Sequence, residues 1–152
     1  NTDKYFWAMG NCCLAANWGY SGKCFGEAMI CAEKKGAFAY IGSAPSSYWY
    51  EDYYFGVGAT NVFYQMPTYE QTSFGVYDAV FSEGFNSISA VPFIGNVAVA
   101  YSHANGYQGS VSDRYYWESY HVFGDGSVTP YHVVPTESAS IHTLYQQTQA
   151  HI

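Results

Sequence analysis

Two short apolar runs, separated by a helical segment, constrain the fold of this 152-residue chain more than any other feature. Tyr5 to Met9 and Ala37 to Ile41 lack polar alternation, which is typical of strands buried on both faces of a parallel sheet. Between them, Cys24 to Lys35 has helical spacing, with Ser21 as the expected cap and Gly36 as the expected stop. The order strand, helix, strand predicts a βαβ unit and so an α/β fold.

The rest of the chain predicts more helices and a late strand. Helices are expected over Glu51–Phe63, Phe74–Phe85, Ile88–Tyr101 and Tyr115–Val122, followed by a turn at Phe123–Gly126 and a strand over Val128–Val134. Thr136 to Ile152 is polar and too short to fold alone. We therefore expect residues 136–152 to be a linker or the first strand of a following domain.

Composition excludes two classes of partner. Five Lys and Arg against twelve Asp and Glu give a net charge of -7, which leaves no basic face for the phosphates of a nucleic acid. No apolar run reaches the roughly 18 residues of a membrane span. Because only 11% of residues are charged and 20% are aromatic, we expect an uncharged, aromatic surface of the kind that secreted or cell-surface proteins use for binding.

The four cysteines do not form a disulfide pattern. Cys24 and Cys31 are separated by about 10 Å along the predicted helix, beyond bridging distance. Cys12 and Cys13 are adjacent, and a bridge between neighbours is strained. The sequence therefore predicts free thiols, and a free thiol in an extracellular protein calls for a chemical explanation.

Two loops that carry polar or reactive groups follow the predicted strands. Cys12 and Cys13 come after the first strand, and residues 43–49 come after the second. Ligands bind at the carboxyl ends of parallel strands, so we expect both loops at one edge of the sheet. A cysteine here has the exposure and the free backbone N–H groups that a nucleophile needs, but a cysteine in such a position is more often a small buried hydrophobic residue.

The second loop leads into an acidic pair among aromatic residues, Glu51 and Asp52. A carboxylate beside aromatic rings favours a cationic side chain, because the rings pack on its methylenes. Alternatively, the pair complements the positive end of the next helix. A third interpretation is a carbohydrate-binding or adhesion module, in which the rings form a stacking platform: Tyr48, Trp49, Tyr50, Tyr53 and Tyr54.

Several long segments match one family in order. These are GNCC, SGKCFGEAM, GAFAYIGSAPSSYWYEDYYFGVGA and YYWESYHVFGDGSVTPY, which begin at residues 10, 21, 36 and 115. From Asn1 to Pro135 the chain resembles the gingipain family of cysteine peptidases, of the caspase-like clan, in its lysine-specific form. The resemblance implies that 1–135 is the C-terminal part of a catalytic domain with a mostly parallel sheet flanked by helices. It also implies that a domain after residue 135 is immunoglobulin-like.

The resemblance also implies roles for particular residues. Cys13 is the nucleophile, with Cys12 as its packing neighbour, and Asp52 recognises the lysine before the cleaved bond of a protein or peptide. The expected substrate contacts are Tyr48, Trp49, Ser47 and Asn11. Family members carry the base histidine on a preceding strand, so we expect the upstream part of the same catalytic domain to supply it and this chain alone to be inactive.

The remaining expectations concern histidines and calcium. None of the chain's histidines matches the family base, and all are expected to be surface or packing residues: His103, His121, His132, His142 and His151. No cofactor is expected in catalysis. The resemblance implies that the Glu27 carboxylate and the Trp18 carbonyl help to bind a structural Ca²⁺; alternatively, Glu27 is a solvated residue at a helix end. A noncatalytic, surface-binding relative that has lost the base is the alternative function.

Overall fold

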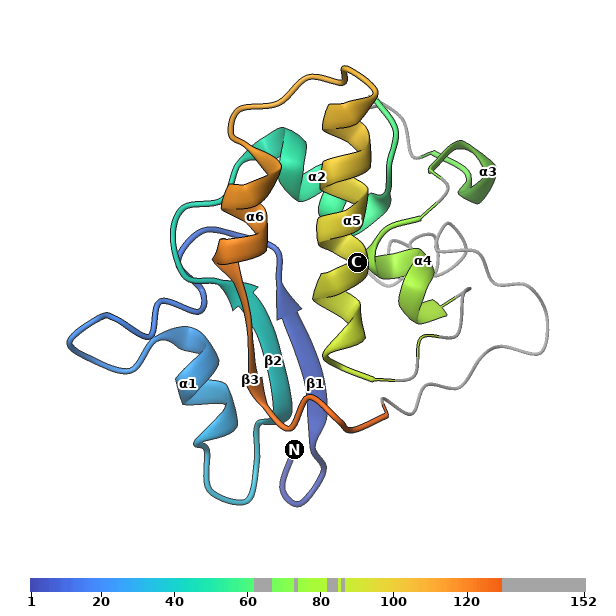
Figure 1. The fold of residues 1–152 in the computed structure, drawn as a ribbon. Helices are drawn as coiled ribbons and strands as arrows, with labels where there is room; N and C mark the ends of the chain where they lie inside the picture. Colours follow the sequence, from blue (N-terminus) through green and yellow to red (C-terminus); the bar gives the residue numbers. More distant parts are fainter. Residues whose placement is uncertain (62–66, 73, 82–84, 86, 130–152) are drawn as a thin grey trace, which may run out of the picture.

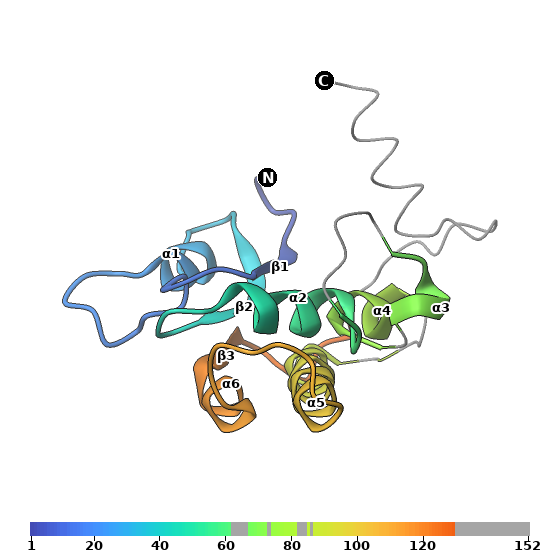
Figure 2. The ribbon, with the colours of Figure 1, turned by 90° about the horizontal axis from the view of Figure 1, so that it is seen from above.

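A computed structural model describes residues 1–61, 67–72, 74–81, 85 and 87–129. A sheet lies between helix α1 on one face and helices α5 and α6 on the other, with α2 beyond the end of β2 (Figures 1 and 2). The elements in chain order are β1 (Phe6–Gly10), α1 (Phe25–Ile30), β2 (Ala37–Ser43), α2 (Trp49–Val57), α3 (Tyr69–Thr72), α4 (Val76–Phe81), α5 (Ala90–Ala104), α6 (Asp113–Ser119) and β3 (Tyr120–Gly124).

The sheet confirms the predicted βαβ unit and adds an antiparallel strand. The strand order is β1-β2-β3; β1 runs parallel to β2, with Gly10 opposite Gly42, and β3 runs antiparallel to β2, with Tyr120 opposite Ser43. The described sheet thus has one parallel and one antiparallel pair. The sequence predicts that Tyr5 to Met9 is buried on both faces, but β1 lies at an edge of the described sheet, and Phe6 is 41% exposed.

Strand β3 replaces the second half of a predicted helix. The helix expected over Tyr115–Val122 ends at Ser119, because the aromatic and branched residues that follow pair with β2 instead. Gly124 closes β3 with φ 93°, and a Cβ there would collide with the Phe38 carbonyl oxygen. The predicted strand over Val128–Val134 lies mostly outside the described residues, as do residues 136–152.

The other helices occupy the predicted regions with different ends. Helix α1 stops at Ile30, and its N-cap is Cys24 rather than Ser21, since Glu27 accepts a hydrogen bond from the Cys24 backbone. Helix α2 begins at Trp49, two residues earlier than predicted, and ends at Val57 where Gly58 takes φ 138°. Helix α5 continues to Ala104, and Pro92 is tolerated because it lies in the first turn.

Alternating side chains of β2 divide the interior into two clusters. Ala39 and Ile41 point into the larger one, which packs against α2, α4 and α5. Tyr40 points to the opposite face and packs with Ala15 and Ala16 under α1. A buried strand with side chains on both faces must be apolar throughout, which explains the uninterrupted run in the sequence.

Helices α2 and α5 approach closely at a glycine. A Cβ on Gly95 would lie 2.5 Å from the ring of Phe55 in α2. That ring in turn stacks on Tyr120 of β3, with ring centroids 4.1 Å apart. Gly95 therefore sets how near α5 lies to the aromatic residues behind the end of the sheet.

A buried carboxylate joins α2 to the loop before α6. Glu51 is fully buried, and its Oε1 accepts hydrogen bonds from the backbone N–H groups of Ser110 (2.5 Å) and Val111 (3.0 Å). His103 of α5 lies 3.5 Å from the same oxygen. This charge-assisted set of contacts fixes the chain just before α6 begins.

Within the described residues, no helix is both long enough and apolar enough to cross a lipid bilayer.

Replacing Gly95 by alanine tests whether packing or helix propensity dominates in α5. Propensity alone predicts stabilisation by about 1 kcal/mol, whereas overpacking against Phe55 costs about 1–3 kcal/mol. We expect Gly95→Ala to lower the midpoint of thermal unfolding of the protein expressed with its whole natural sequence. Gly22→Ala is the control, because its nearest neighbour, Tyr20 Cε1, would be at an ordinary 3.5 Å. A raised midpoint for Gly95→Ala would contradict the close approach.

Removing the Glu51 carboxylate tests the connection to α6. Glu51→Ala leaves two backbone N–H groups without their acceptor, so we expect the free energy of unfolding to fall by about 2–3 kcal/mol. Glu118→Ala is the matched control: this glutamate is 63% exposed and pairs with Arg114, and such exposed pairs contribute about 0.5 kcal/mol or less. Denaturant unfolding measures both, and equal losses would argue against a structural role for Glu51.

Candidate active site

The loop after β1 holds Cys13 at the surface. Leu14, with φ 61°, donates its N–H to the Pro45 carbonyl (3.0 Å), and Ala16 donates to the Ser43 carbonyl (2.9 Å). These two bonds attach the loop to the segment that leaves β2. The prediction that both loops meet at one edge of the sheet is therefore confirmed, and the Cys13 side chain is exposed rather than buried.

Among the described residues, every hydrogen-bond partner of the Cys13 sulfur belongs to Ser47. The Ser47 N–H donates to Sγ at 3.2 Å, the Ser47 carbonyl oxygen lies 3.4 Å away as an acceptor for the thiol, and Oγ is at 3.7 Å. Sulfur can thus donate as a thiol and accept as a thiolate without rearrangement of the loop. Within the same described part of the chain, the Cys13 backbone N–H has no partner and is available to an incoming oxygen atom.

The neighbouring thiol has a different environment. All four cysteines are free, as predicted, and both Cys12 and Cys13 are exposed. Partial desolvation raises the pKa of Cys12 despite its exposure, and the negative charge of Asp52 raises this pKa further. A raised pKa lowers the thiolate fraction of Cys12 at neutral pH.

The Asp52 carboxylate lies in the first turn of α2 and is surrounded by hydroxyl groups. Ser47 Oγ donates to Oδ2 at 2.6 Å, while the hydroxyls of Tyr116 (2.8 Å) and Tyr120 (2.7 Å) lie at Oδ1. Each tyrosine has a second acceptor within reach, the Tyr48 carbonyl or Asn11 Oδ1. Since each hydroxyl has one proton, the charged carboxylate is the stronger competitor for it.

The hydroxyl groups of Tyr116 and Tyr120 act as hydrogen-bond donors to Asp52 because they remain protonated. Both are buried, and burial raises the pKa of Tyr116 and of Tyr120 well above the usual range, with the negative charge of Asp52 acting in the same direction. Their hydroxyl groups therefore keep their protons near neutral pH. Hydrogen bonds from neutral donors stabilise the charged form of a carboxylate without cancelling its charge.

No cation neutralises Asp52 within the described residues. The carboxylates that contact a basic side chain there are Glu118, beside Arg114, and Glu51, beside His103. The Asp52 carboxylate thus accepts hydrogen bonds but has no cationic partner among the described residues. Ser47 lies between this carboxylate and the Cys13 sulfur. Such an arrangement can orient a cationic group next to a nucleophile.

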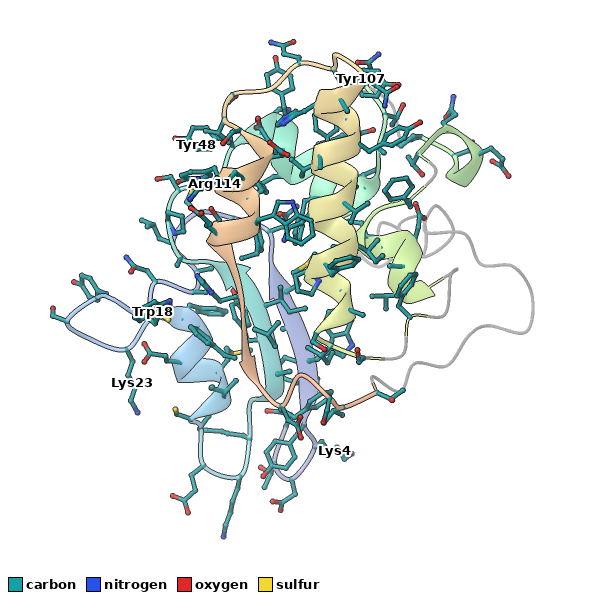
Figure 3. The ribbon with its side chains drawn as sticks, in the orientation of Figure 1. Lys4, Trp18, Lys23, Tyr48, Tyr107 and Arg114 are labelled. Atoms are coloured by element: carbon teal, nitrogen blue, oxygen red, sulfur yellow. The ribbon has the colours of Figure 1, made fainter. Side chains whose placement is uncertain are left out.

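The other predicted contact residues lie around this pair. Asn11 donates from Nδ2 to the Asp52 carbonyl oxygen (2.8 Å), which ties the loop after β1 to α2. Tyr48 lies beside the first turn of α6 (Figure 3), where its ring packs edge-on against Tyr115. Trp49 is 77% exposed at the start of α2.

Of the five histidines that the sequence predicts to be surface or packing residues, two lie in the described residues. His103 contacts Glu51, and His121 in β3 packs edge-on against Trp18 at 6.2 Å (Figure 3). Neither hydrogen-bonds to the Cys13 sulfur. His132, His142 and His151 lie outside the described residues.

The predicted calcium ligands do not form a complete site. Glu27 Oε2 accepts a hydrogen bond from the Cys24 N–H at 2.9 Å, so this carboxylate caps α1. Over the described ranges, no three His, Cys, Asp or Glu side chains gather closely enough to hold a metal ion. Two oxygen ligands are fewer than the six to eight that Ca²⁺ prefers.

Sequence reasoning missed Tyr116 and Tyr120. They lie 64 and 68 residues after Asp52, and nothing in their local pattern distinguishes them from other aromatic residues of the chain. Glu51 was treated with Asp52 as one acidic pair, yet the two carboxylates serve different purposes. The signal that separates them is helical geometry, because adjacent residues of a helix point about 100° apart.

Comparisons with known proteins identify the family of the chain. The family described as "Peptidase family C25" matches residues 1–131 of this chain. Lys-gingipain of Porphyromonas gingivalis is 48% identical over 152 residues, and Lys-gingipain HG66 of the same organism is 47% identical; each match covers 99% of this chain and 9% of the relative. A solved structure described as "Structure of Protease" superposes with a TM-score of 0.83 at 51% identity, covering 86% of this chain and 29% of that one. The chain therefore belongs to peptidase family C25.

Proposed function

We propose that the chain is the nucleophile-carrying part of a secreted bacterial cysteine endopeptidase that cleaves after lysine. One observation carries the proposal: the thiol of Cys13 and the unpaired carboxylate of Asp52 are joined through Ser47 at the carboxyl ends of neighbouring strands. The similarity to Lys-gingipain supports the same substrate class. Since the chain spans 9% of that relative, the activity is proposed for the whole protein.

The reaction begins with attack of the Cys13 thiolate on the carbonyl carbon of the peptide bond. The thiol proton passes to a general base and from there to the departing amine, leaving a thioester on Sγ. Water then attacks the thioester and releases the carboxylic acid product with the free thiol. The unpartnered Cys13 N–H is positioned to stabilise the oxyanion that forms in both steps.

The base is proposed to be a histidine outside this chain. The Cys13 sulfur contacts Ser47 and no described histidine. By the family resemblance, residues 1–135 form the C-terminal part of a caspase-like catalytic domain, and the upstream part supplies the histidine. The nucleophile after β1 and the parallel β1-β2 pair are consistent with that clan.

Specificity follows from the charge that Asp52 presents. A lysine ammonium can replace Ser47 or share the carboxylate with it, while the lysine methylenes pack on the exposed rings of Tyr48 and Trp49. Ser47 and Asn11 complete the proposed contacts. Lysine is favoured over arginine by the family resemblance.

A structural calcium ion forms part of the same proposal. The ligands from this chain would be the Glu27 carboxylate and the Trp18 carbonyl oxygen. The ion then requires further oxygen ligands from another part of the protein, and no catalytic step depends on it.

Neutralising Asp52 tests the proposed specificity. In the protein expressed with its whole natural sequence, Asp52→Asn should reduce kcat/KM on lysyl substrates by about 100- to 1,000-fold, because a desolvated charge pair is lost. Substrates with an uncharged residue before the cleaved bond should lose far less. Asp113→Asn is the control, since that aspartate is exposed in the first turn of α6. Equal losses on both substrate types would contradict the assignment.

Labelling with a lysyl chloromethyl ketone tests the choice of nucleophile. We expect alkylation at Cys13, located by peptide mass spectrometry, with Cys12→Ala labelled as fast as the parent and Cys13→Ala unlabelled and inactive. Free lysine side-chain analogues should slow the reaction. Modification of Cys12 instead would overturn the nucleophile choice, and no affinity labelling at either thiol would favour a noncatalytic relative.

A further inference from the structure

The Ser47 hydroxyl lies between the two groups that the proposed reaction needs. Its oxygen is 2.6 Å from Asp52 Oδ2 and 3.7 Å from Cys13 Sγ. A serine hydroxyl has one proton, so it can donate to only one of these acceptors at a time. The shorter distance assigns the proton to Asp52 in the structure.

In this arrangement the Cys13 sulfur faces a carbonyl oxygen and shares Ser47 with a carboxylate. The Ser47 carbonyl oxygen, 3.4 Å from the sulfur, accepts the thiol proton and would repel a thiolate. The negative charge of Asp52 contributes, after desolvation, to the raised pKa of the adjacent Cys12. Only the Ser47 N–H, at 3.2 Å, stabilises negative charge on the sulfur.

We propose that Ser47 couples recognition to reactivity: a cationic side chain bound to Asp52 releases the Ser47 hydroxyl to donate to Cys13 and so increases the reactivity of the nucleophile. The inference rests on the proposed function and goes beyond it. An ammonium group at Oδ2 both cancels the nearby negative charge and competes with Ser47 as a donor. The hydroxyl is then free to turn toward the sulfur, for which the Tyr120 hydroxyl oxygen, also in contact with Ser47, is the competing acceptor.

The protons and charges balance in this step. The thiol proton goes to the general base, the new negative charge resides on Sγ, and Ser47 keeps its own proton throughout. Other titratable groups that face the sulfur in the described structure come from three segments. These are Asp52 of α2, Cys12 of the same loop, and Tyr115 of α6, whose pKa is raised by burial and whose hydroxyl donates to the Ser46 carbonyl at 2.9 Å.

The coupling makes lysine an activator as well as a ligand. A substrate with an uncharged residue before the cleaved bond would bind while the Ser47 hydroxyl still donates to Asp52, so the sulfur would lack this donor. Discrimination should therefore appear in the acylation rate as well as in KM, which distinguishes coupling from a pocket that only binds.

The test measures alkylation of Cys13 by iodoacetamide in the protein expressed with its whole natural sequence. Iodoacetamide is neutral and has no affinity for Asp52. We expect n-butylammonium, which mimics the lysine side chain, to accelerate alkylation about 3- to 10-fold, the change that a moderate shift in thiolate population produces. Neutral n-butanol should have no effect. Peptide mass spectrometry separates Cys13 from the exposed Cys12 and Cys31.

Variants of Ser47 isolate the hydroxyl. In Ser47→Ala the acceleration should fall below twofold, although n-butylammonium should still inhibit lysyl hydrolysis competitively. Ser47→Thr retains a hydroxyl and should restore the response. Unfolding midpoints close to that of the parent would exclude a general loss of structure.

The outcomes separate the two proposals. If n-butylammonium inhibits lysyl hydrolysis but leaves alkylation unchanged or slows it, the coupling is wrong and the proposed function stands. If Ser47→Ala responds like the parent, charge alone acts and the role of Ser47 is overturned. If lysyl substrates are not cleaved and n-butylammonium does not bind, the proposed function fails and the coupling fails with it.

Discussion

The hydrogen bonds to the carboxylate and the main-chain carbonyl of Asp52 are the interactions on which the site depends. They bring together four segments: the loop after β1 through Asn11, the loop after β2 through Ser47, helix α2, and the α6-β3 segment through Tyr116 and Tyr120. Ser47 and Asp52 are five residues apart, whereas Asn11 and the α6-β3 segment are far from both in sequence. A change in any of them moves the carboxylate relative to the Cys13 sulfur.

The groups that donate hydrogen bonds to the Asp52 carboxylate are neutral hydroxyl groups, and their neutrality has a functional consequence. An arginine or lysine at the position of Tyr116 or Tyr120 would also hold the carboxylate, but it would cancel the negative charge. Buried tyrosines supply geometry and desolvation while the charge remains available. The aromatic packing behind them, in which Phe55 stacks on Tyr120 and lies against Gly95, keeps both hydroxyls in place.

Glu51 and Asp52 illustrate how adjacent residues of one helix can take separate tasks. Glu51 points into the protein and holds the backbone at Ser110 and Val111, just before α6. Asp52 points toward the loops at the end of the sheet. The first carboxylate therefore positions the helix that carries Tyr116, which in turn positions the second carboxylate.

Local sequence pattern was sufficient to predict the βαβ unit, the free thiols and the meeting of two loops at one edge of the sheet. Apolar runs and glycine stops are properties of short segments, so they can be read without the tertiary structure. Local pattern was insufficient for β3, which had been predicted as the end of a helix, and for Tyr116 and Tyr120. A strand at the end of a chain segment forms only if a partner edge is available, and here β2 provides it. The register of that pairing, with Tyr120 opposite Ser43, brings a hydroxyl to a carboxylate 68 residues away. The sequence by itself thus determined which groups could react, and the tertiary structure decided which of them meet, since contacts between distant segments depend on packing rather than on local periodicity.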